Sequence, residues 1–426
     1  MPSDFLKEEK NRLDETKVLR DPVHGYIHID LPVIWNLIDT PEFQRLRRIR
    51  QLGGDIQVYH AGEHSRFAHS LGVYELARRM IEEVDGLKES LDELHYTAGL
   101  CTALLHDLGH GPFSHCFEEI AQISHEQMTI SLILDERTAV NRVLKAQDRR
   151  LPALCASILA HQSDCPLLED LISSQLDCDR MDYLLRDAYM TGTKYGSFDL
   201  ERVLRTMRTV DGKLCIKHSG MHSVEDYIMA RYQMYWQVYL HPDAAGYELL
   251  LITFFKRYGQ IRLQKENQIA LLEPVFDLEF DPVRYCLLDD FSLMTGIVQA
   301  QGSPDPILAD LAFRLASRRL LAWMEKPTVS QIEAIEERLK AQGMDPAFYL
   351  HIKAMRHEEY LPYREDESRP IRIVENGRLH DLSECSAVAR ALLEMKNSAS
   401  WRLYYPKNLD IHSQSAGKDR NFPTES

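Results

Sequence analysis

The sequence predicts a mainly α-helical protein with a short N-terminal hairpin and a small C-terminal α/β lobe. Apolar residues recur at helical spacing over most of residues 32–258. Alternating apolar residues flank Pro22 and Gly25, and a second alternating pattern surrounds an Asn376-Gly377 turn. We therefore expect an N-terminal segment with the hairpin (1–30), a helical core with a helical extension (31–344), the α/β lobe (345–412) and a disordered tail (413–426).

The first elements follow directly from these patterns. Residues 17–30, KVLRDPVHGYIHID, alternate apolar and polar side chains around the Pro22 to Gly25 turn and predict the hairpin. Helical spacing predicts one helix over 67–84 and a second over 94–105. A capping box of Ser90 and Glu93 is expected at the start of the second helix.

Further helices and turns are predicted later in the chain. Residues 177–187 and 223–239 predict helices, and the Asp211-Gly212 turn predicts a hairpin between them. Residues 308–326, LADLAFRLASRRLLAWMEK, predict one amphipathic helix. Ser330 and Glu333 are expected to cap another helix, which ends near Gly343. In the α/β lobe, PIRIVENGRLHDL predicts a hairpin and WRLYYP a strand.

Composition excludes several classes of function. The formal net charge is −15, so the average field repels polyanions and no binding to duplex nucleic acid is expected. We find no run of about 18 apolar residues, and therefore expect no membrane span. The eight cysteines form no CxxC pair, which favours a reducing cytoplasm. A small anionic substrate is still compatible with this net charge, because a metal ion and a few arginines can reverse the electrostatic potential inside one cleft.

Histidine and aspartate gather at the ends of two predicted helices. His69 lies on the first helix, and His106 with Asp107 ends the second. Two packed helices and one further carboxylate form a suitable site for a divalent cation. The segment QLDCDRMDYLLRD (175–187) supplies the further carboxylate, and its candidates are Asp177, Asp179 and Asp182.

Three more histidines, His110, His115 and His125, follow this pair closely. Gly109, Gly111 and Pro112 interrupt the helix, so the later side chains can turn back over the same site. A single His-Asp pair at a helix end is ordinarily a cap or a surface ion pair. The density of titratable side chains favours a reactive site here.

The order His69, His106-Asp107 and Asp179 resembles the signature of the HD-domain metal phosphohydrolases. The flanking residues resemble one branch more closely, the deoxynucleoside triphosphate (dNTP) triphosphohydrolases, which include the vertebrate sterile-alpha-motif and HD-domain enzyme and bacterial relatives. The stretches that carry the resemblance are DTPEFQRLRRIRQLGG (39–54), RFAHSLGV (66–73), LLHDLGHGPFSHCFE (104–118), SHEQ (124–127) and DCDRMDYLLRD (177–187).

The resemblance implies an HD-domain helical core and assigns roles by position. The resemblance implies one divalent cation per active site, which could be Mn, Fe, Mg, Zn or Ni. Its implied ligands are His69, His106, Asp107 and Asp179. Further Mg²⁺ would come with the nucleotide. The implied catalytic group beside the metal is His110, His115, Glu118 and His125. The implied substrate contacts are Gln51, Leu52, Arg66, Arg180, Tyr183, Asp187, Arg231, Tyr235 and Tyr239.

The implied reaction is hydrolysis of a dNTP to deoxynucleoside and triphosphate. Water attacks the α-phosphorus and expels the 5′-oxygen, which is a poor leaving group unless an acid protonates it. His115 is the predicted acid, with Glu118 and the other histidines setting its orientation. Gln51 and Leu52 would lie against the deoxyribose and leave no room for a 2′-hydroxyl.

The resemblance also implies regulation. Positions that match a guanine-nucleotide site between subunits are Lys17, Asp39, Gln44 and Arg47, and those that match an adjacent nucleotide site are Asp199 and Arg202. GTP, dGTP or a dNTP would then activate a homotetramer, a dimer of dimers; alone, the same residues would be a solvated charged face. Two alternatives stay open for the chain: another HD-type phosphohydrolase, such as a nucleotidase or an alarmone hydrolase, and a non-catalytic nucleotide sensor.

Overall fold

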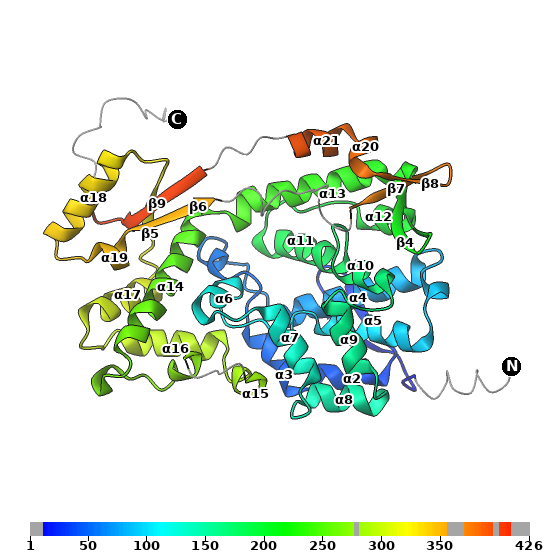
Figure 1. The fold of residues 1–426 in the computed structure, drawn as a ribbon, viewed down its shortest axis with the longest axis horizontal. Helices are drawn as coiled ribbons and strands as arrows, with labels where there is room; N and C mark the ends of the chain where they lie inside the picture. The colour runs from blue at the N-terminus through cyan, green and yellow to red at the C-terminus, as the bar shows by residue number, and fades with distance from the viewer. Residues whose placement is uncertain (1–11, 277–280, 356–369, 395–399, 410–426) are drawn as a thin grey trace, which may run out of the picture.

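The computed structural model describes residues 12–276, 281–355, 370–394 and 400–409. Within them the fold is mainly helical, with a hairpin near the N-terminus and small sheets formed largely by the C-terminal part, which confirms the predicted fold class (Figure 1). The predicted disordered tail (413–426) lies outside the described residues. None of the described helices is long and apolar enough to cross a bilayer.

The predicted N-terminal hairpin consists of β1 (Lys17–Asp21) and β2 (Gly25–Ile29), which pair antiparallel. Gly25 lies at φ +76°, a conformation that glycine adopts without strain. Backbone and ring nitrogens of His28 contact the Glu75 carboxylate, and the Tyr74 hydroxyl donates to the His28 carbonyl. The hairpin is therefore fastened to the helix that carries Tyr74 and Glu75.

That helix, α4 (Arg66–Glu83), packs against α5 (Glu93–Leu105) and α11 (Cys178–Thr191) and is buried over most of its surface. These three helices confirm the predictions for 67–84, 94–105 and 177–187. The other helices of the core are α2 (Pro32–Ile38), α3 (Pro41–Arg45), α6 (His115–Ala121), α7 (His125–Leu134), α8 (Ala139–Gln147), α9 (Leu151–Leu159), α10 (Pro166–Ile172), α12 (Leu200–Thr206), α13 (Met221–Met234) and α14 (Pro242–Ile261).

Both predicted capping boxes are wrong in register. Asp92 caps α5 by accepting from the His95 backbone N–H, whereas the Ser90 hydroxyl donates to the Gly86 carbonyl. The cap of helix α18 (Val329–Ala341) is Thr328, two residues before the predicted cap, and it forms a capping box with Gln331. In each case an alternative cap of suitable type lies two residues away, so local sequence alone could not select the register.

The single helix predicted for 308–326 is also wrong. Helix α17 (Pro306–Ala316) ends well before it, Arg318 turns the chain at φ +53°, and Leu321–Glu325 forms strand β5. β5 pairs antiparallel with β9 (Ser400–Pro406). Apolar residues at 320, 321 and 324 fit a helix locally, but the strand partner lies about 80 residues away and overrides that pattern.

The C-terminal α/β part consists of two small sheets at opposite ends of the molecule (Figure 1). One has the order β3-β4-β7-β8 and joins both predicted hairpins through parallel pairing of β4 with β7. The other has the order β5-β9-β6 and packs on α14 through β5. The remaining strands and helices are β3 (Met207–Val210), β4 (Lys213–Lys217), β6 (His351–Met355), β7 (Arg372–Glu375), β8 (Arg378–Asp381), α15 (Pro282–Tyr285), α16 (Asp290–Ala300), α19 (Pro346–Tyr349), α20 (Leu382–Cys385) and α21 (Ala387–Glu394).

Candidate active site

Two imidazoles and two carboxylates meet where α4, α5 and α11 pack. His69 Nε2 lies 3.0 Å from Asp179 Oδ1, and His106 Nε2 lies 3.6 Å from the same oxygen. Asp107 completes the group, with Oδ2 3.6 Å from His69 Nε2 and Oδ1 3.4 Å from His106 Nε2. Both Nε2 atoms are buried, and neither has a hydrogen-bond partner among the described residues. Unpaired buried nitrogens that face carboxylates are costly unless a cation lies between them.

The other ring nitrogens fix the tautomers. His69 Nδ1 lies 2.8 Å from Asp182 Oδ2, and His106 Nδ1 lies 2.9 Å from the Ala103 carbonyl oxygen. Both partners are acceptors, so each Nδ1 carries a hydrogen, and each Nε2 can offer its lone pair to a cation once it has no proton of its own. This donor set fits a divalent cation held by His69, His106, Asp107 and Asp179.

The charges of these four side chains also favour a bound cation. Burial lowers the pKa of His69, but the carboxylates of Asp179 and Asp182 outweigh burial and raise it to about 10. Burial alone would raise the pKa of Asp107, yet the Arg66 guanidinium holds it well below its usual range. The cluster thus favours positive charge on its imidazoles, and a bound cation would satisfy the same demand.

The three candidate aspartates of α11 occupy different positions. Asp177 caps the helix by accepting from the backbone N–H groups of Ser174 and Arg180. Asp182 faces the far side of the His69 ring. Asp179, in the first turn, is the one of the three whose carboxylate lies near both Nε2 atoms.

Asp182 belongs to a buried network that the sequence did not reveal. Its Oδ1 lies 2.6 Å from His24 Nε2 and accepts from the Arg186 guanidinium at 2.9 Å. Arg186 also donates to Asp21 at 2.8 Å. Asp21 and His24 come from the hairpin and its turn, so the N-terminal hairpin holds the aspartate that orients His69.

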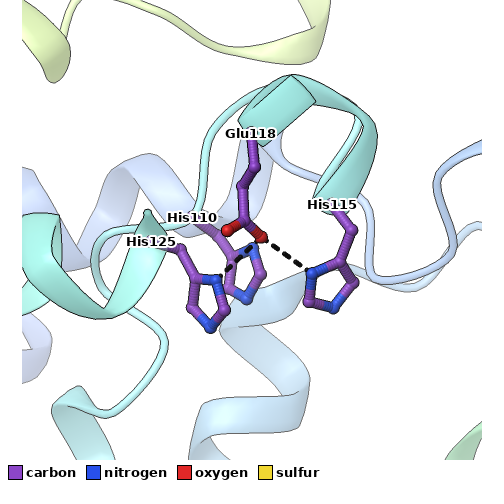
Figure 2. A group of neighbouring side chains, drawn as sticks. All are labelled: His110, His115, Glu118 and His125. Atoms are coloured by element: carbon purple, nitrogen blue, oxygen red, sulfur yellow. Dashed lines mark hydrogen bonds and ion pairs between the residues drawn. The ribbon is translucent and has the colours of Figure 1, made fainter. Parts of the chain in front are cut away.

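His110, His115, Glu118 and His125 form a second cluster (Figure 2). Glu118 Oε1 is 2.8 Å from both His115 Nδ1 and His125 Nδ1. The His110 and His125 rings stack with centroids 3.9 Å apart, and His110 Nε2 lies 3.3 Å from Asp107 Oδ1. His110 therefore connects the two clusters.

Burial gives the members of this cluster different charges. Burial, reinforced by Arg66, holds the pKa of His110 well below its usual value and keeps the ring neutral. Partial burial would raise the pKa of Glu118, but hydrogen bonds with His115 and His125 outweigh it and lower that pKa, so Glu118 stays a carboxylate. The His115 side chain is 73% exposed and the other rings are more buried, so His115 is the imidazole most open to a substrate.

The loop between α5 and α6 is built to present these rings. A side chain at Gly109 would place its Cβ only 2.3 Å from the backbone of His125 and Thr129, so glycine lets the loop pack onto α7. The Arg45 guanidinium, also buried, donates to the carbonyls of Leu108, His110 and Leu288. Arg45 is a further supporting residue that the sequence pattern did not indicate.

Most predicted site residues line one cavity of about 720 Å³. Those that do are Gln51, Leu52, Arg66, Asp107, His110, His115, His125, Asp179, Tyr183, Asp187, Tyr235 and Tyr239. The others, His69, His106, Glu118, Arg180 and Arg231, are not among its lining residues. Arg66 is buried and pairs with Asp107 and with Ser114 Oγ, so it neutralises a metal-site carboxylate from within the cavity wall.

Aromatic residues form another wall of the cavity. Residues Tyr235–Tyr239 continue α13 as a π-helix, an irregularity that often occurs at functional sites. The Arg231 guanidinium lies 5.8 Å from the Tyr235 ring centroid, and the rings of Tyr235 and Tyr239 are 5.3 Å apart. The Tyr239 hydroxyl donates to Asp187 at 2.6 Å.

The six predicted regulatory residues do not line this cavity. Lys17, Asp39, Arg47, Asp199 and Arg202 are exposed, and Gln44 is half-buried. Arg47 donates to Gln44 Oε1 and lies 3.6 Å from the Phe67 ring centroid. Asp199 caps α12 through the backbone N–H of Arg202.

The chain matches two known family models and a solved structure. Residues 66–187 match the HD domain, and residues 198–251 match the HD associated region. A solved phosphohydrolase from Bacteroides thetaiotaomicron superposes with a TM-score of 0.81 at 26% identity, covering 92% of this chain and all of that one.

Two curated relatives differ in how much they share. The uncharacterized protein YwfO of Bacillus subtilis is 42% identical over 93% of this chain and 94% of its own length. A deoxynucleoside triphosphate triphosphohydrolase SAMHD1 homolog from Dictyostelium discoideum is 30% identical over 58% of this chain, and the match covers 50% of that protein. On these matches and on its His/Asp cluster, the chain belongs to the HD-domain phosphohydrolases with an HD associated region.

Proposed function

We propose that this protein hydrolyses dNTPs to deoxynucleoside and triphosphate. One observation carries the proposal: His115, held by Glu118, lines the same cavity as the metal-site residues Asp107 and Asp179. An exposed imidazole oriented by a carboxylate beside a cation site suits protonation of a leaving oxygen. The relatives named dNTP triphosphohydrolases, about 30% identical over part of this chain, support the choice of substrate.

His69, His106, Asp107 and Asp179 would hold the cation, which when bound lowers the pKa of a water molecule and offsets negative charge on the phosphoryl group. The residues of the chain then bind and orient the substrate. Asp182 and the Ala103 carbonyl keep the two imidazoles in the ligating tautomer. Arg180 and Arg231, next to the tyrosine wall, supply positive charge for phosphate oxygens.

His115 is the proposed general acid. Its Nδ1 donates to Glu118, which leaves Nε2 free to give a proton to the departing 5′-oxygen. His125 shares the same Glu118 oxygen and keeps that carboxylate in place. Neutral His110 stacks on His125 and reaches Asp107, so it joins the acid group to the cation site.

The reaction products distinguish the proposed hydrolysis from its alternatives. Purified protein loaded with Mn²⁺ is incubated with each dNTP, with and without GTP or dGTP, and the products are resolved by ion-exchange chromatography. Equal amounts of deoxynucleoside and triphosphate are expected. Release of orthophosphate or pyrophosphate alone contradicts the proposal, and faster turnover of ribonucleotides or monophosphates indicates a different HD-type phosphohydrolase.

Substitution of His115 separates catalysis from sensing. The His115→Ala protein is expected to lose roughly 10²- to 10⁴-fold in kcat, the usual contribution of a positioned proton donor, while it still binds dNTP. Asp226→Asn, an exposed change on α13, is the control. Unchanged kcat in His115→Ala would remove the proposed acid, and binding without turnover in the native protein would make it a sensor.

A further inference from the structure

The cavity continues beyond the residues assigned so far, toward the C-terminal sheet. Its far end is lined by Asp55, by Glu248 of α14 and by Lys353 of β6, together with Ala354, Arg402 and Tyr404. None of these residues has a role in the proposed hydrolysis. The far end is therefore open to a part of the substrate other than the reacting phosphate.

A series of neighbouring residues connects Arg231 to Asp55 through the wall of the cavity. Arg231 lies against Tyr235, Tyr235 against Tyr239, and the Tyr239 hydroxyl donates to Asp187. Asp187 is in turn near enough to Asp55 to affect its charge. Arg231 thus lies behind the tyrosine wall, Tyr235, Tyr239 and Asp187 line the cavity next to it, and Asp55 with Glu248 and Lys353 line the part beyond them. Phosphate, sugar and base would occupy these positions in turn.

The far end has unused hydrogen-bonding capacity. Asp55 Oδ1 is buried and has no hydrogen-bond partner in the part of the chain that the structure describes. Burial, with Glu248 and Asp187 adding to it, raises the pKa of Asp55 well above its usual value. N–H donors on a ligand would give Oδ1 a hydrogen-bond partner and would stabilise the ionised carboxylate. Beside this acceptor, Lys353 Nζ lies 3.4 Å from Glu248 Oε2, and both side chains are partly exposed to the cavity.

We infer that this end of the cavity binds the Watson–Crick edge of guanine, with Asp55 accepting from N1–H and the 2-amino group and Lys353, held by Glu248, donating to O6. The inference rests on the proposed dNTP hydrolysis and names its preferred base. A carboxylate can accept two parallel hydrogen bonds from adjacent donors. Guanine offers two adjacent donors next to an acceptor.

The other bases fit less well. Adenine places the acceptor N1 beside its 6-amino group, and cytosine places the acceptor N3 beside its 4-amino group. Thymine has one N–H group between two carbonyl oxygens. Each would bring an acceptor against the Asp55 carboxylate, which costs binding energy.

The test compares dGTP with dITP, which lacks only the 2-amino group. For the metal-loaded protein, kcat/KM for dGTP should exceed that for dITP and for dATP, dCTP and dTTP by at least tenfold, the usual effect of losing one hydrogen bond to a charged group. Asp55→Asn should reduce the dGTP-to-dITP ratio to within about threefold. Lys353→Met should lower kcat/KM for both purines alike, because both keep O6. Glu333→Gln, an exposed change on α18, is the control.

Each outcome has one meaning. Equal rates for dGTP and dITP, or a preference that persists in Asp55→Asn, overturn the guanine inference and leave dNTP hydrolysis standing. Failure to release triphosphate from any dNTP overturns the proposed function. In that case calorimetric binding of dGTP and dITP to the metal-free protein still tests the subsite, and equal affinities overturn it. Circular dichroism melting shows whether each variant is folded.

Discussion

At the level of single residues, Asp182 supports the candidate metal site without being one of its ligands. Asp182 is fully buried, fixes the His69 tautomer and is itself held by His24 and Arg186. Such supporting carboxylates raise the basicity of the ligating imidazole and restrict its rotation. The hairpin residues therefore contribute to metal binding without touching the metal.

We expect Asp182→Asn to weaken Mn²⁺ binding by about 10- to 100-fold, the usual effect of removing a supporting carboxylate. The amide can still approach His69, but it brings no charge and one fewer acceptor. Competition with a chelating dye measures the dissociation constant without reference to activity. Asp226→Asn, exposed and distant in sequence, should bind Mn²⁺ like the native protein; equal affinity in Asp182→Asn would contradict the supporting role.

Metal binding should also weaken as pH falls. In the absence of a cation the carboxylates of Asp179 and Asp182 outweigh burial and raise the pKa of His69 to about 10, so that ring is positively charged at neutral pH; the pKa of His106 is raised as well. A cation must displace the extra proton of His69. Apparent affinity for Mn²⁺ should therefore rise with pH, about tenfold per unit for each proton displaced, up to the pKa of His69. Dye competition at pH 6, 7 and 8 measures the slope, and a flat profile would contradict proton displacement.

The sequence predicted the four candidate metal ligands better than the residues that hold those ligands in place. His69, His106 and Asp107 lie at helix ends in a local pattern, and the family signature places Asp179 with them. Asp182 contacts His24 across 158 residues, and Asp55 contacts a cavity built from distant segments. Such contacts join residues far apart in the sequence, so no local periodicity predicts them and only the packed structure shows them.

At the level of elements, helix caps offer a direct check of the structure. Thr328 Oγ1 accepts from the Gln331 backbone N–H, and the Gln331 side chain accepts from the Thr328 backbone N–H. We expect Thr328→Ala to lower the free energy of unfolding by about 1 kcal/mol, the usual cost of losing a cap. Urea unfolding followed by circular dichroism measures it. Glu333→Ala, which removes the cap partner expected from sequence, should change that free energy by less than about 0.5 kcal/mol; the reverse order would place the cap at Ser330.

Elements with local signals were predicted, and those with distant partners were not. The helices over 66–83 and 178–191 follow apolar spacing, and the 211–212 and 376–377 turns follow their Gly-containing dipeptides. Strand β5 was predicted as helix, because its pairing with β9 is absent from the local sequence. The parallel pairing of β4 with β7, which joins both hairpins in one sheet, has the same long-range origin.

At the level of the whole molecule, the cavity requires segments from nearly the entire described chain. Gln51 to Asp55 come from the N-terminal part, the histidines from the HD domain, and Lys353 and Arg402 from the C-terminal sheet. A net charge of −15 repels a polyanion, so the proposed phosphate binding would depend on local positive charge, from Arg66 in the cavity wall and from a bound cation. Recognition of the proposed substrate would thus need the assembled chain and not the HD domain alone.

Regulation would act through the same assembly. Lys17 lies on the hairpin whose turn holds Asp182, and exposed Arg47 follows α3. A nucleotide bound between subunits at these residues would fix the hairpin and, through His24 and Asp21, the orientation of His69. From the family resemblance we propose that dGTP or GTP binds there and converts the protein from smaller species to a tetramer, which sedimentation velocity measures.

The double variant Lys17→Ala/Arg47→Ala should not assemble with nucleotide, because both cationic contacts to the phosphates would be lost. Arg149→Ala removes an exposed arginine elsewhere on the surface and should assemble normally. The double variant should also keep its Mn²⁺ affinity, since neither residue belongs to the Asp182 network. A sedimentation coefficient that is the same with and without nucleotide would show that assembly, if it occurs, is independent of an effector; loss of assembly in Arg149→Ala as well would point to a general effect of surface charge.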